Sequence, residues 1–330
     1  MADTTYDVVG IGNAIVDIIG RCTDAFLAEH GASKGHMRLV DADTVVKLYQ
    51  AMGPGIEISG GSGANTMVGV ASFGGKSAFI GKVADDELGR IFAHDIRAAG
   101  VTYQTSPSTG GQPTARSLIL VTPDGERTMN TFLGVSPELN HGEVDAALVA
   151  AAQVVYLEGY LFDRPEAKAA FRQAARIAKS AGRKVSLTLS DAFCVERHRA
   201  EFLELIRADV DILFANESEI LSLYRVATFD EAARLARADC ELAVLTRSAK
   251  GSVIFSGETA VTITPEPVAR VIDTTGAGDL YAAGFLYGYT AGKPLEQCGR
   301  LGSIAAAEII SHVGARPETP LAKLAAQKGL

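Results

Sequence analysis

A string of glycines, hydroxyl side chains and carboxylates carries the clearest chemistry of this sequence. It runs Asp273, Thr274, Thr275, Gly276, Ala277, Gly278, Asp279. Glycines at a helix N-terminus let an anion reach free backbone N–H groups, and the helix dipole stabilises its charge. A carboxylate in the first helical turn can accept the proton of an attacking hydroxyl. The string therefore predicts phosphoryl transfer with Asp279 as the base. The predicted anion hole is Gly276, Ala277 and Gly278.

The residues on either side of this string predict the elements that position it. Residues 268–272 are apolar and branched apart from Arg270, which favours a strand that runs into the loop. From Ala277 to Leu286, apolar side chains recur at helical spacing, so we expect a helix to begin at the loop. A glycine-rich turn with an Asp that merely favours the helix dipole is the alternative interpretation.

Short apolar runs alternate with longer helical patterns over most of the 330 residues. This alternation predicts an α/β fold, with a mostly parallel central sheet flanked by helices. The predicted strands are Val8 to Ile11, Ser77 to Ile80, Val154 to Leu157, Val185 to Leu189, Ile212 to Ala215 and Leu242 to Leu245.

Two stretches, 13–43 and 105–135, break this alternation. The second contains the alternating segments Ala115 to Val121 and Arg127 to Phe132, with a turn at 122–125 between them. We expect these stretches to form a small β-sheet. The rest of the chain, at 1–12, 44–104 and 136–330, is then predicted to be the core.

Three further segments occur in order along the chain. A Gly-Asn-x-x-x-Asp element is formed by Gly12, Asn13 and Asp17, a glycine-rich segment runs through 60–75, and an Asn-x-x-Glu element is formed by Asn216 and Glu219. Together with the string at its C-terminal end, these segments make the chain resemble the PfkB, or ribokinase, family of carbohydrate and nucleoside kinases. The resemblance implies a ribokinase-like fold in which the small sheet is a lid that excludes water from the substrate.

The family resemblance also assigns residues to the acceptor. It implies that Asn13, Asp17, Gly61 and Asn65 bind the sugar hydroxyls, which suits carboxylate and amide groups because hydroxyls both donate and accept hydrogen bonds. The alternative is that Asn13 and Asp17 only cap turns. The segments at 12–17, 127–129 and 293–300 are similar to adenosine kinases in particular. This similarity implies a base pocket lined by Leu39, Met129, Thr131 and Tyr160, with Arg127 near the phosphates. Ordinary core packing is the alternative for Met129 and Tyr160.

The nucleotide side is implied by the same resemblance. Asn216 and Glu219 follow an apolar run, and they would organise the phosphates and Mg²⁺, Glu219 through water. A helix N-cap is the alternative. Residues 246–251 resemble a Thr-x-Gly-x-x-Gly element, in which Ser248 replaces the first glycine. The ATP-binding residues implied are Asn216, Thr246, Ser248, Gly251, Thr275, Gly276, Gly278 and Ser303. A monovalent cation, K⁺, is implied near Asp273, Thr275 and Ala315.

Composition excludes several other classes of protein. The net charge is −8 and no basic stripe is visible, so we expect no nucleic-acid partner. The four cysteines are far apart, which argues against a thiolate metal site. Acidic residues such as Asp7 stand where a secretory signal would need basic ones, and no apolar stretch could span a bilayer. We therefore expect a cytoplasmic protein without membrane contact, either a monomer or a homodimer through the lid.

These observations predict a Mg²⁺- and ATP-dependent kinase that phosphorylates the 5′-hydroxyl of a nucleoside, with adenosine as the favoured acceptor. A sugar kinase acting on ribose, fructose or a related sugar is the second hypothesis. A catalytically silent nucleoside-binding regulator is a third, because a fold does not establish an activity.

Overall fold

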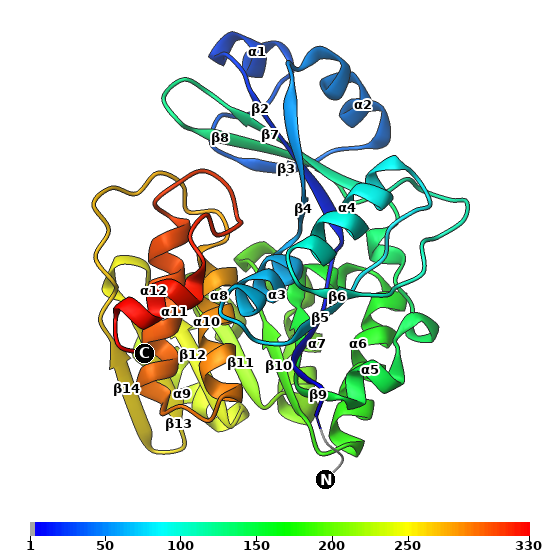
Figure 1. Ribbon diagram of the computed structural model, residues 1–330. Coiled ribbons are helices and arrows are strands. Elements are labelled where there is room, and N and C mark those ends of the chain that lie inside the picture. The colour runs from blue at the N-terminus through cyan, green and yellow to red at the C-terminus, as the bar shows by residue number, and fades with distance from the viewer. Residues whose placement is uncertain (1–3) are drawn as a thin grey trace.

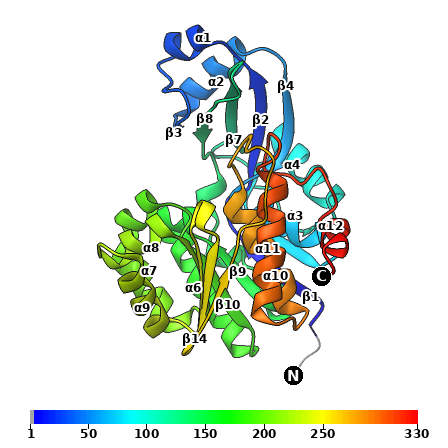
Figure 2. The ribbon, with the colours of Figure 1, turned by 90° about the vertical axis from the view of Figure 1, so that its left-hand side faces the viewer.

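A large sheet covered by helices on both faces forms the body of the molecule in the computed structural model, which describes residues 4–330 (Figures 1 and 2). The first three residues of the predicted core segment 1–12 therefore lie outside the described residues. The strand order is β14-β13-β12-β11-β10-β9-β1-β5-β6. Neighbours from β6 to β12 pair in parallel, and β13 and β14 are added antiparallel at one edge. The predicted α/β fold with a mostly parallel sheet is confirmed.

The strands of this sheet begin and end close to the apolar runs of the sequence. They are β1 Tyr6–Ile11, β5 Ser77–Ile80, β6 Thr102–Tyr103, β9 Ala152–Glu158, β10 Lys184–Thr188, β11 Ile212–Asn216, β12 Leu242–Thr246, β13 Ser252–Ser256 and β14 Thr259–Ile263. Alternate side chains of a strand pack on opposite faces. In β9, Val155 and Leu157 join one hydrophobic cluster, whereas Val154 and Tyr156 join the other. Burial on both faces explains why the strands read as continuous apolar runs.

Different helices close the two hydrophobic clusters. One cluster contains side chains of α5 Ala146–Ala150, α6 Pro165–Ser180, α7 Ala192–Asp209, α8 Glu217–Tyr224 and α9 Phe229–Asp239. The other contains side chains of α3 Ser62–Ser72, α4 Glu87–Ala98, α10 Ala277–Thr290, α11 Leu295–Ile309 and α12 Leu321–Gln327. None of the helices in the described residues combines the length and hydrophobicity that a bilayer crossing requires.

A second, smaller sheet stands over one end of the large sheet (Figure 1). Its order is β3-β8-β7-β2-β4. The strands are β2 Ile15–Arg21, β3 Met37–Leu39, β4 Gly55–Gly60, β7 Ala115–Val121 and β8 Arg127–Phe132, and the helices α1 Asp24–Glu29 and α2 Ala42–Ala51 accompany them. The hairpin of β7 and β8 has the bounds and the turn that the sequence predicts.

The first segment of the small sheet is longer than its predicted range of 13–43. Strand β4, at 55–60, lies in the range predicted to be core, yet it pairs antiparallel with β2 from Ile15 opposite Gly60 to Gly20 opposite Gly55. Without β4, the backbone groups along one edge of β2 would be unpaired, so the chain returns to the core only after Gly60. The predicted boundary at 43 is therefore wrong.

Candidate active site

A cavity of about 620 Å³ lies between the carboxyl ends of the large sheet and the small sheet. Open α/β sheets bind their ligands at this edge. The large-sheet side of the cavity is lined by Asn13, Glu158, Thr188, Asn216 and Thr246. The small-sheet side is lined by Ile15, Asp17, Met37, Leu39, Met129 and Thr131. The loop before α10 and the first turn of this helix, from Thr274 to Asp279, complete the wall.

The segment that enters this loop is irregular, and the strand predicted at 268–272 is wrong. On the side of the sheet that ends at β14, the edge strand is antiparallel, and residues 268–272 do not pair with it. Instead, the backbone N–H of Ile272 donates to the carbonyl of Ile310 at the end of α11, at 2.8 Å. Val271 is 51 % exposed. The loop is thus held by a helix end rather than by the sheet.

Helix α10 begins at Ala277, as predicted, and the two glycines beside it have different structural roles. Gly276 is the N-cap residue, with φ of 77°, a conformation that favours glycine. Within the described residues, a Cβ atom on Gly278 would meet no atom within 4 Å. Gly278 therefore borders open space, as a backbone that is approached by an anion must.

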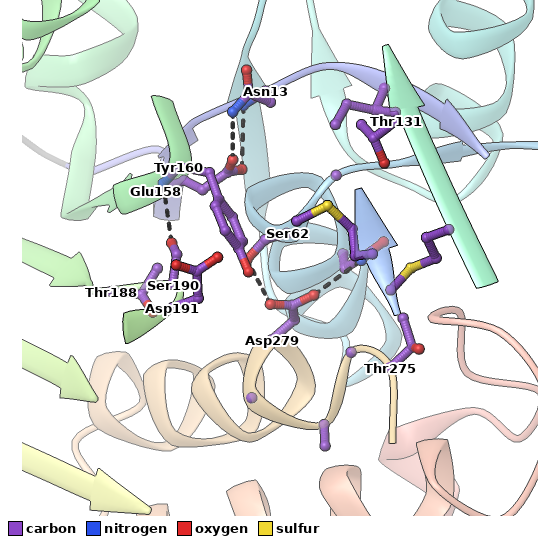
Figure 3. Close-up of a pocket in the computed structure, with 18 of the residues that line it drawn as sticks. Asn13, Ser62, Thr131, Glu158, Tyr160, Thr188, Ser190, Asp191, Thr275 and Asp279 are labelled. Atoms are coloured by element: carbon purple, nitrogen blue, oxygen red, sulfur yellow. Dashed lines mark hydrogen bonds between the residues drawn. The ribbon is translucent and has the colours of Figure 1, made fainter. Parts of the chain in front are cut away.

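Asp279 lies in the first turn of α10 and is held by two side chains of α3 (Figure 3). Its Oδ1 accepts a hydrogen bond from Ser62 Oγ at 2.6 Å, and its Oδ2 accepts one from Asn65 Nδ2 at 3.0 Å. Burial raises the pKa of Asp279, whereas these two hydrogen bonds and the charge of Arg316 lower it. The carboxylate is thus oriented, and these contacts partly offset the effect of burial, which leaves its pKa raised.

Glu158, which the sequence interpretation missed, ends β9 beside this carboxylate. Its side chain is 1 % exposed and accepts hydrogen bonds from Asn13 N–H at 3.2 Å, Asn13 Nδ2 at 2.9 Å and Gly63 N–H at 2.7 Å (Figure 3). Burial raises the pKa of Glu158 to about 7, against the opposing effect of these hydrogen bonds. Glu158 thereby ties the end of β1 to the start of α3.

Asn13 and Gly61, both predicted to bind the acceptor, line the cavity in different ways. The Asn13 amide donates to Glu158, and its Oδ1 accepts from Ser136 Oγ at 2.9 Å. Gly61 has φ of 94°, and a Cβ atom there would lie 2.2 Å from the Asn13 carbonyl oxygen. Only glycine fits at this close approach, so both residues shape the corner where β1 passes into the small sheet.

Asp17 and Asn65 present polar atoms to the same cavity. Burial raises the pKa of Asp17 to about 6, while the charges of Arg316 and Arg127 lower it. Asn65 is 5 % exposed, and its Oδ1 has no hydrogen-bond partner within the described residues. Buried acceptors are usually paired, so this oxygen is available to a ligand hydroxyl.

Apolar side chains cover the opposite part of the cavity. Leu39, Met129 and Thr131 line it as predicted, and β3 and β8 carry them side by side, with Met37 opposite Met129 and Leu39 opposite Thr131. Leu39 is 55 % exposed. Across from the small sheet lies Tyr160, whose backbone N–H donates to Ser190 Oγ at 3.1 Å (Figure 3).

Asn216 and Glu219 form a helix cap and also line the cavity. Asn216 Oδ1 accepts from Glu219 N–H at 2.9 Å, and the Glu219 carboxylate accepts in return from Asn216 N–H at 2.9 Å. The helix-cap interpretation is confirmed, and the predicted role toward Mg²⁺ and the phosphates stays a prediction. Burial, followed by the charges of Asp191 and Asp279, raises the pKa of Glu219 to about 7. A divalent cation here would offset the repulsion among these carboxylates, so the residues fit Mg²⁺.

The remaining residues predicted to bind ATP lie in two places. Thr246 lines the cavity at the end of β12. Ser248 has φ of 51°, which explains why the family element has glycine at this position, and Gly251 has φ of 82°. Ser303 lies apart, where its Oγ accepts from Glu266 N–H at 2.7 Å beside a second cavity of about 530 Å³.

Arg127, predicted to lie near the phosphates, contacts the loop that leads into α10. Its guanidinium forms an ion pair with Asp273, the first residue of the anion loop, which is the segment 273–278. The Asp273 carboxylate also accepts from the N–H groups of Thr275 and Gly314, each at 3.0 Å. Ala315 lies against Gly276. The three residues predicted to hold K⁺ are thus close together, but they do not fit it, because Asp273 already has three donors, one of which is the cationic guanidinium of Arg127.

Several residues that build the site were missed by the sequence interpretation: Glu158, Ser62, Asp191, Phe193 and Arg316. Glu158 directly follows a predicted buried strand, so its position offered a signal. Phe193 lines the cavity and is 74 % exposed. Arg316 donates to the carbonyls of Ser59 and Ala64 from the far C-terminal segment, and no local pattern marks that contact.

Comparison with known proteins agrees with this geometry. The model of the pfkB family carbohydrate kinases matches residues 57–322. The chain belongs to this family. It is therefore a kinase that transfers a phosphoryl group to a hydroxyl, with ATP as co-substrate.

Relatives within the family differ in the acceptor that their names give. The adenosine kinase from Sinorhizobium meliloti is 55 % identical over 98 % of this chain and 100 % of its own, with a TM-score of 0.92. A probable sugar kinase from Rhizobium etli CFN 42 is 53 % identical over 99 % of both chains, with the same TM-score. An uncharacterised sugar kinase from Archaeoglobus fulgidus is 29 % identical over 77 % of this chain and 98 % of its own.

Proposed function

We propose that this kinase phosphorylates the 5′-hydroxyl of a nucleoside, with adenosine as the acceptor. The observation that carries the proposal is that one cavity joins Asp279 and the anion loop to the apolar side chains of the small sheet. A nucleoside has a hydroxyl to present to the carboxylate and a flat base to pack on apolar side chains. The similarity to the Sinorhizobium meliloti adenosine kinase supports the same acceptor.

Asp279 is the proposed general base. Ser62 and Asn65 orient its carboxylate and favour the ionised form that accepts a proton. The N–H groups from Gly276 to Gly278 would stabilise the charge on the transferred phosphoryl group. Phosphoryl transfer passes through a loose transition state, so positioning the two reactants and neutralising charge supply most of the catalysis.

The acceptor would lie across the cavity between these groups and the small sheet. Asp17 and the unpaired Oδ1 of Asn65 are the proposed partners of the ribose hydroxyls, and Asn13 and Gly61 shape the corner beside them. The base would pack on an apolar wall of the small sheet, with Tyr160 opposite. Leu39 and Met129 form this wall, and Thr131 lies beside them.

ATP would approach from the other side of the anion loop. Asn216, Thr246, Ser248 and Gly251 are the proposed phosphate-side contacts, and Thr275 joins them from the loop. The second cavity is lined in part by the apolar side chains of Val268, Ile304 and Ala307 and lies beside Ser303, and the base of ATP could pack on these side chains. Glu219 would hold hydrated Mg²⁺ through water, and the ion would neutralise the phosphate charge.

The small sheet is the proposed lid. Its inner face carries the apolar wall, so a substrate beneath it would be shielded from water, which otherwise competes as phosphoryl acceptor. Strand β4 forms one edge of this sheet, and its residue Ile56 is 67 % exposed. A second copy of the chain that pairs with this edge would give a homodimer through the lid. Light scattering on the purified protein distinguishes this dimer from a monomer.

A sugar kinase is the second candidate. The similarity to the probable sugar kinase of Rhizobium etli favours it, and the carboxylate and amides of Asp17, Asn13 and Asn65 suit a free sugar as well as a ribose ring. The apolar wall separates the two candidates, because a free sugar makes no use of it.

A panel of acceptors tests the proposal by measuring ATP consumption with adenosine, 2′-deoxyadenosine, other nucleosides, ribose and fructose. Adenosine should exceed 2′-deoxyadenosine by at least about tenfold in kcat/KM, since polar groups built for a hydroxyl are left unpaired without it. Asp17→Ala should remove most of this difference. Asp279→Asn is the control, with kcat lower by about a hundredfold or more at unchanged Tm.

Two outcomes would contradict the assignment. Faster turnover of a free sugar than of every nucleoside would replace it with the sugar kinase. Nucleoside binding without turnover of any acceptor would favour a silent regulator.

A further inference from the structure

The ion pair between Arg127 and Asp273 joins two parts of the molecule. Arg127 is the first residue of β8 in the small sheet, and Asp273 begins the loop that leads into α10. Both side chains are 6 % exposed. Of the salt bridges among residues 4–330, this is the one that connects the small sheet to the main body. The contact thus couples the small sheet directly to the anion loop.

Each oxygen of Asp273 is already engaged in this arrangement. Oδ1 accepts from the N–H of Thr275 at 3.0 Å, and Oδ2 accepts from the N–H of Gly314 at 3.0 Å and from the Arg127 guanidinium. The bond from Thr275 closes a turn within the loop before α10, and the bond from Gly314 fixes this loop against the segment that follows α11. Asp273 is therefore the residue that holds both segments together.

The charge at this point is balanced by the guanidinium. A buried carboxylate needs a positive partner, and Arg127 supplies it from the small sheet. The charge of Arg127 also reaches Asp17, which lies on β2 of the same sheet. A monovalent cation near Asp273, Thr275 and Ala315 would be repelled by the charge of Arg127. Because the site is buried, solvent and salt would screen this repulsion only weakly.

We propose that the Arg127 guanidinium takes the place of a monovalent cation beside the anion loop, so that this kinase needs no K⁺ for turnover. The inference rests on the proposed phosphoryl transfer at Asp279 and adds how the loop is held for it. Arg127 is a positioning residue in this proposal, because it acts on the loop through Asp273.

The test compares wild-type protein in potassium chloride and in tetramethylammonium chloride at equal ionic strength. We expect kcat/KM for the best acceptor to agree within about twofold in the two salts. The Tm should be the same in both salts within experimental error. Arg127→Met should lose at least about tenfold in kcat/KM in tetramethylammonium, and K⁺ should restore much of this loss and raise the Tm. Arg127→Lys should keep the wild-type independence of K⁺.

Lys34→Met is the matched control, because Lys34 pairs with Asp24 and Asp124 within the small-sheet part of the chain. It should show no difference between the two salts. A wild-type enzyme that loses activity or Tm when K⁺ is withdrawn overturns the proposal, whatever the variants do. If no acceptor is turned over, the proposed function fails, but the Tm comparison still decides whether K⁺ binds.

Discussion

Glu158 shows how one buried carboxylate can organise a site without reacting in it. It accepts three hydrogen bonds from two segments that β1 and α3 bring together, and both segments also carry residues proposed to bind the acceptor. Burial holds its pKa at about 7, against an ordinary value of 4.5. The charge state of Glu158 therefore changes near neutral pH, and the stability of the site should change with it.

We predict that the unliganded protein loses stability as pH rises through about 7. Between pH 4.5 and 7 the folded protein retains a proton on Glu158 that the unfolded chain releases, so this contribution is complete below pH 4.5 and lost above pH 7. Each unit of raised pKa corresponds to about 1.4 kcal/mol. Glu158→Gln should flatten the slope of unfolding free energy against pH.

Chemical denaturation at several pH values measures this slope. Glu219 and Asp17, with pKa values raised to about 7 and about 6, contribute in the same direction, so some slope should remain in Glu158→Gln. Glu258→Gln, on the surface, should behave as wild type. A Glu158→Gln slope equal to that of wild type would show that this carboxylate is ionised throughout.

The sequence predicts the residues of this site unevenly. Asp279, Asp17 and Asn65 stand in continuous motifs, so the amino-acid sequence alone is enough to assign them to the site. Glu158 directly follows an apolar run, and only its position at a strand end distinguishes it from other acidic residues. Arg316 reaches the site through contacts with Ser59 and Ala64 that are distant in sequence, and no local spacing encodes them.

At the scale of elements, the two glycines at the start of α10 have different roles, and substitutions distinguish them. Gly278→Val should lower kcat by about a hundredfold with little change in Tm, because a side chain there enters open space where the phosphoryl group would lie. Gly276→Ala should lower stability by about 1–3 kcal/mol, because its φ is 77° and its Cβ would lie 2.9 Å from that of Ala315. Thermal melts and steady-state kinetics on both variants check the contrast.

A Gly278→Val protein that turns over normally would contradict the assignment of the loop as an anion site. Equal losses of Tm in the two variants would indicate that both glycines serve only the backbone.

Element boundaries were harder to predict than element types. The hairpin of β7 and β8 has the predicted bounds because alternation and a Pro-Asp-Gly turn define it locally. Strand β4 was assigned to the core, since its pairing with β2 depends on a distant partner. The apolar segment at 268–272 suggested a strand, but its backbone contacts the end of α11 instead of a sheet edge, a partner that the local pattern does not show.

At the scale of the whole molecule, the first strand of the chain lies well inside the large sheet. β1 pairs in parallel with β5 on one side and with β9 on the other. We predict that a chain beginning at Gly12 fails to unfold cooperatively, because the hydrogen bonds of both neighbours lose their partner. A chain beginning at Thr5 keeps all of β1 and should melt like wild type in circular dichroism. A cooperative transition in the shorter chain would contradict this role for β1.

The inner position of β1 also sets an order of events during translation. One edge of β1 can be paired once residues 77–80 have left the ribosome, but the other edge stays open until residues 152–158 follow. For that interval, an apolar strand edge is exposed on the nascent chain, and such edges promote association between chains. A chaperone that binds extended apolar segments would therefore meet this protein early, before the strand that completes its centre has been synthesised.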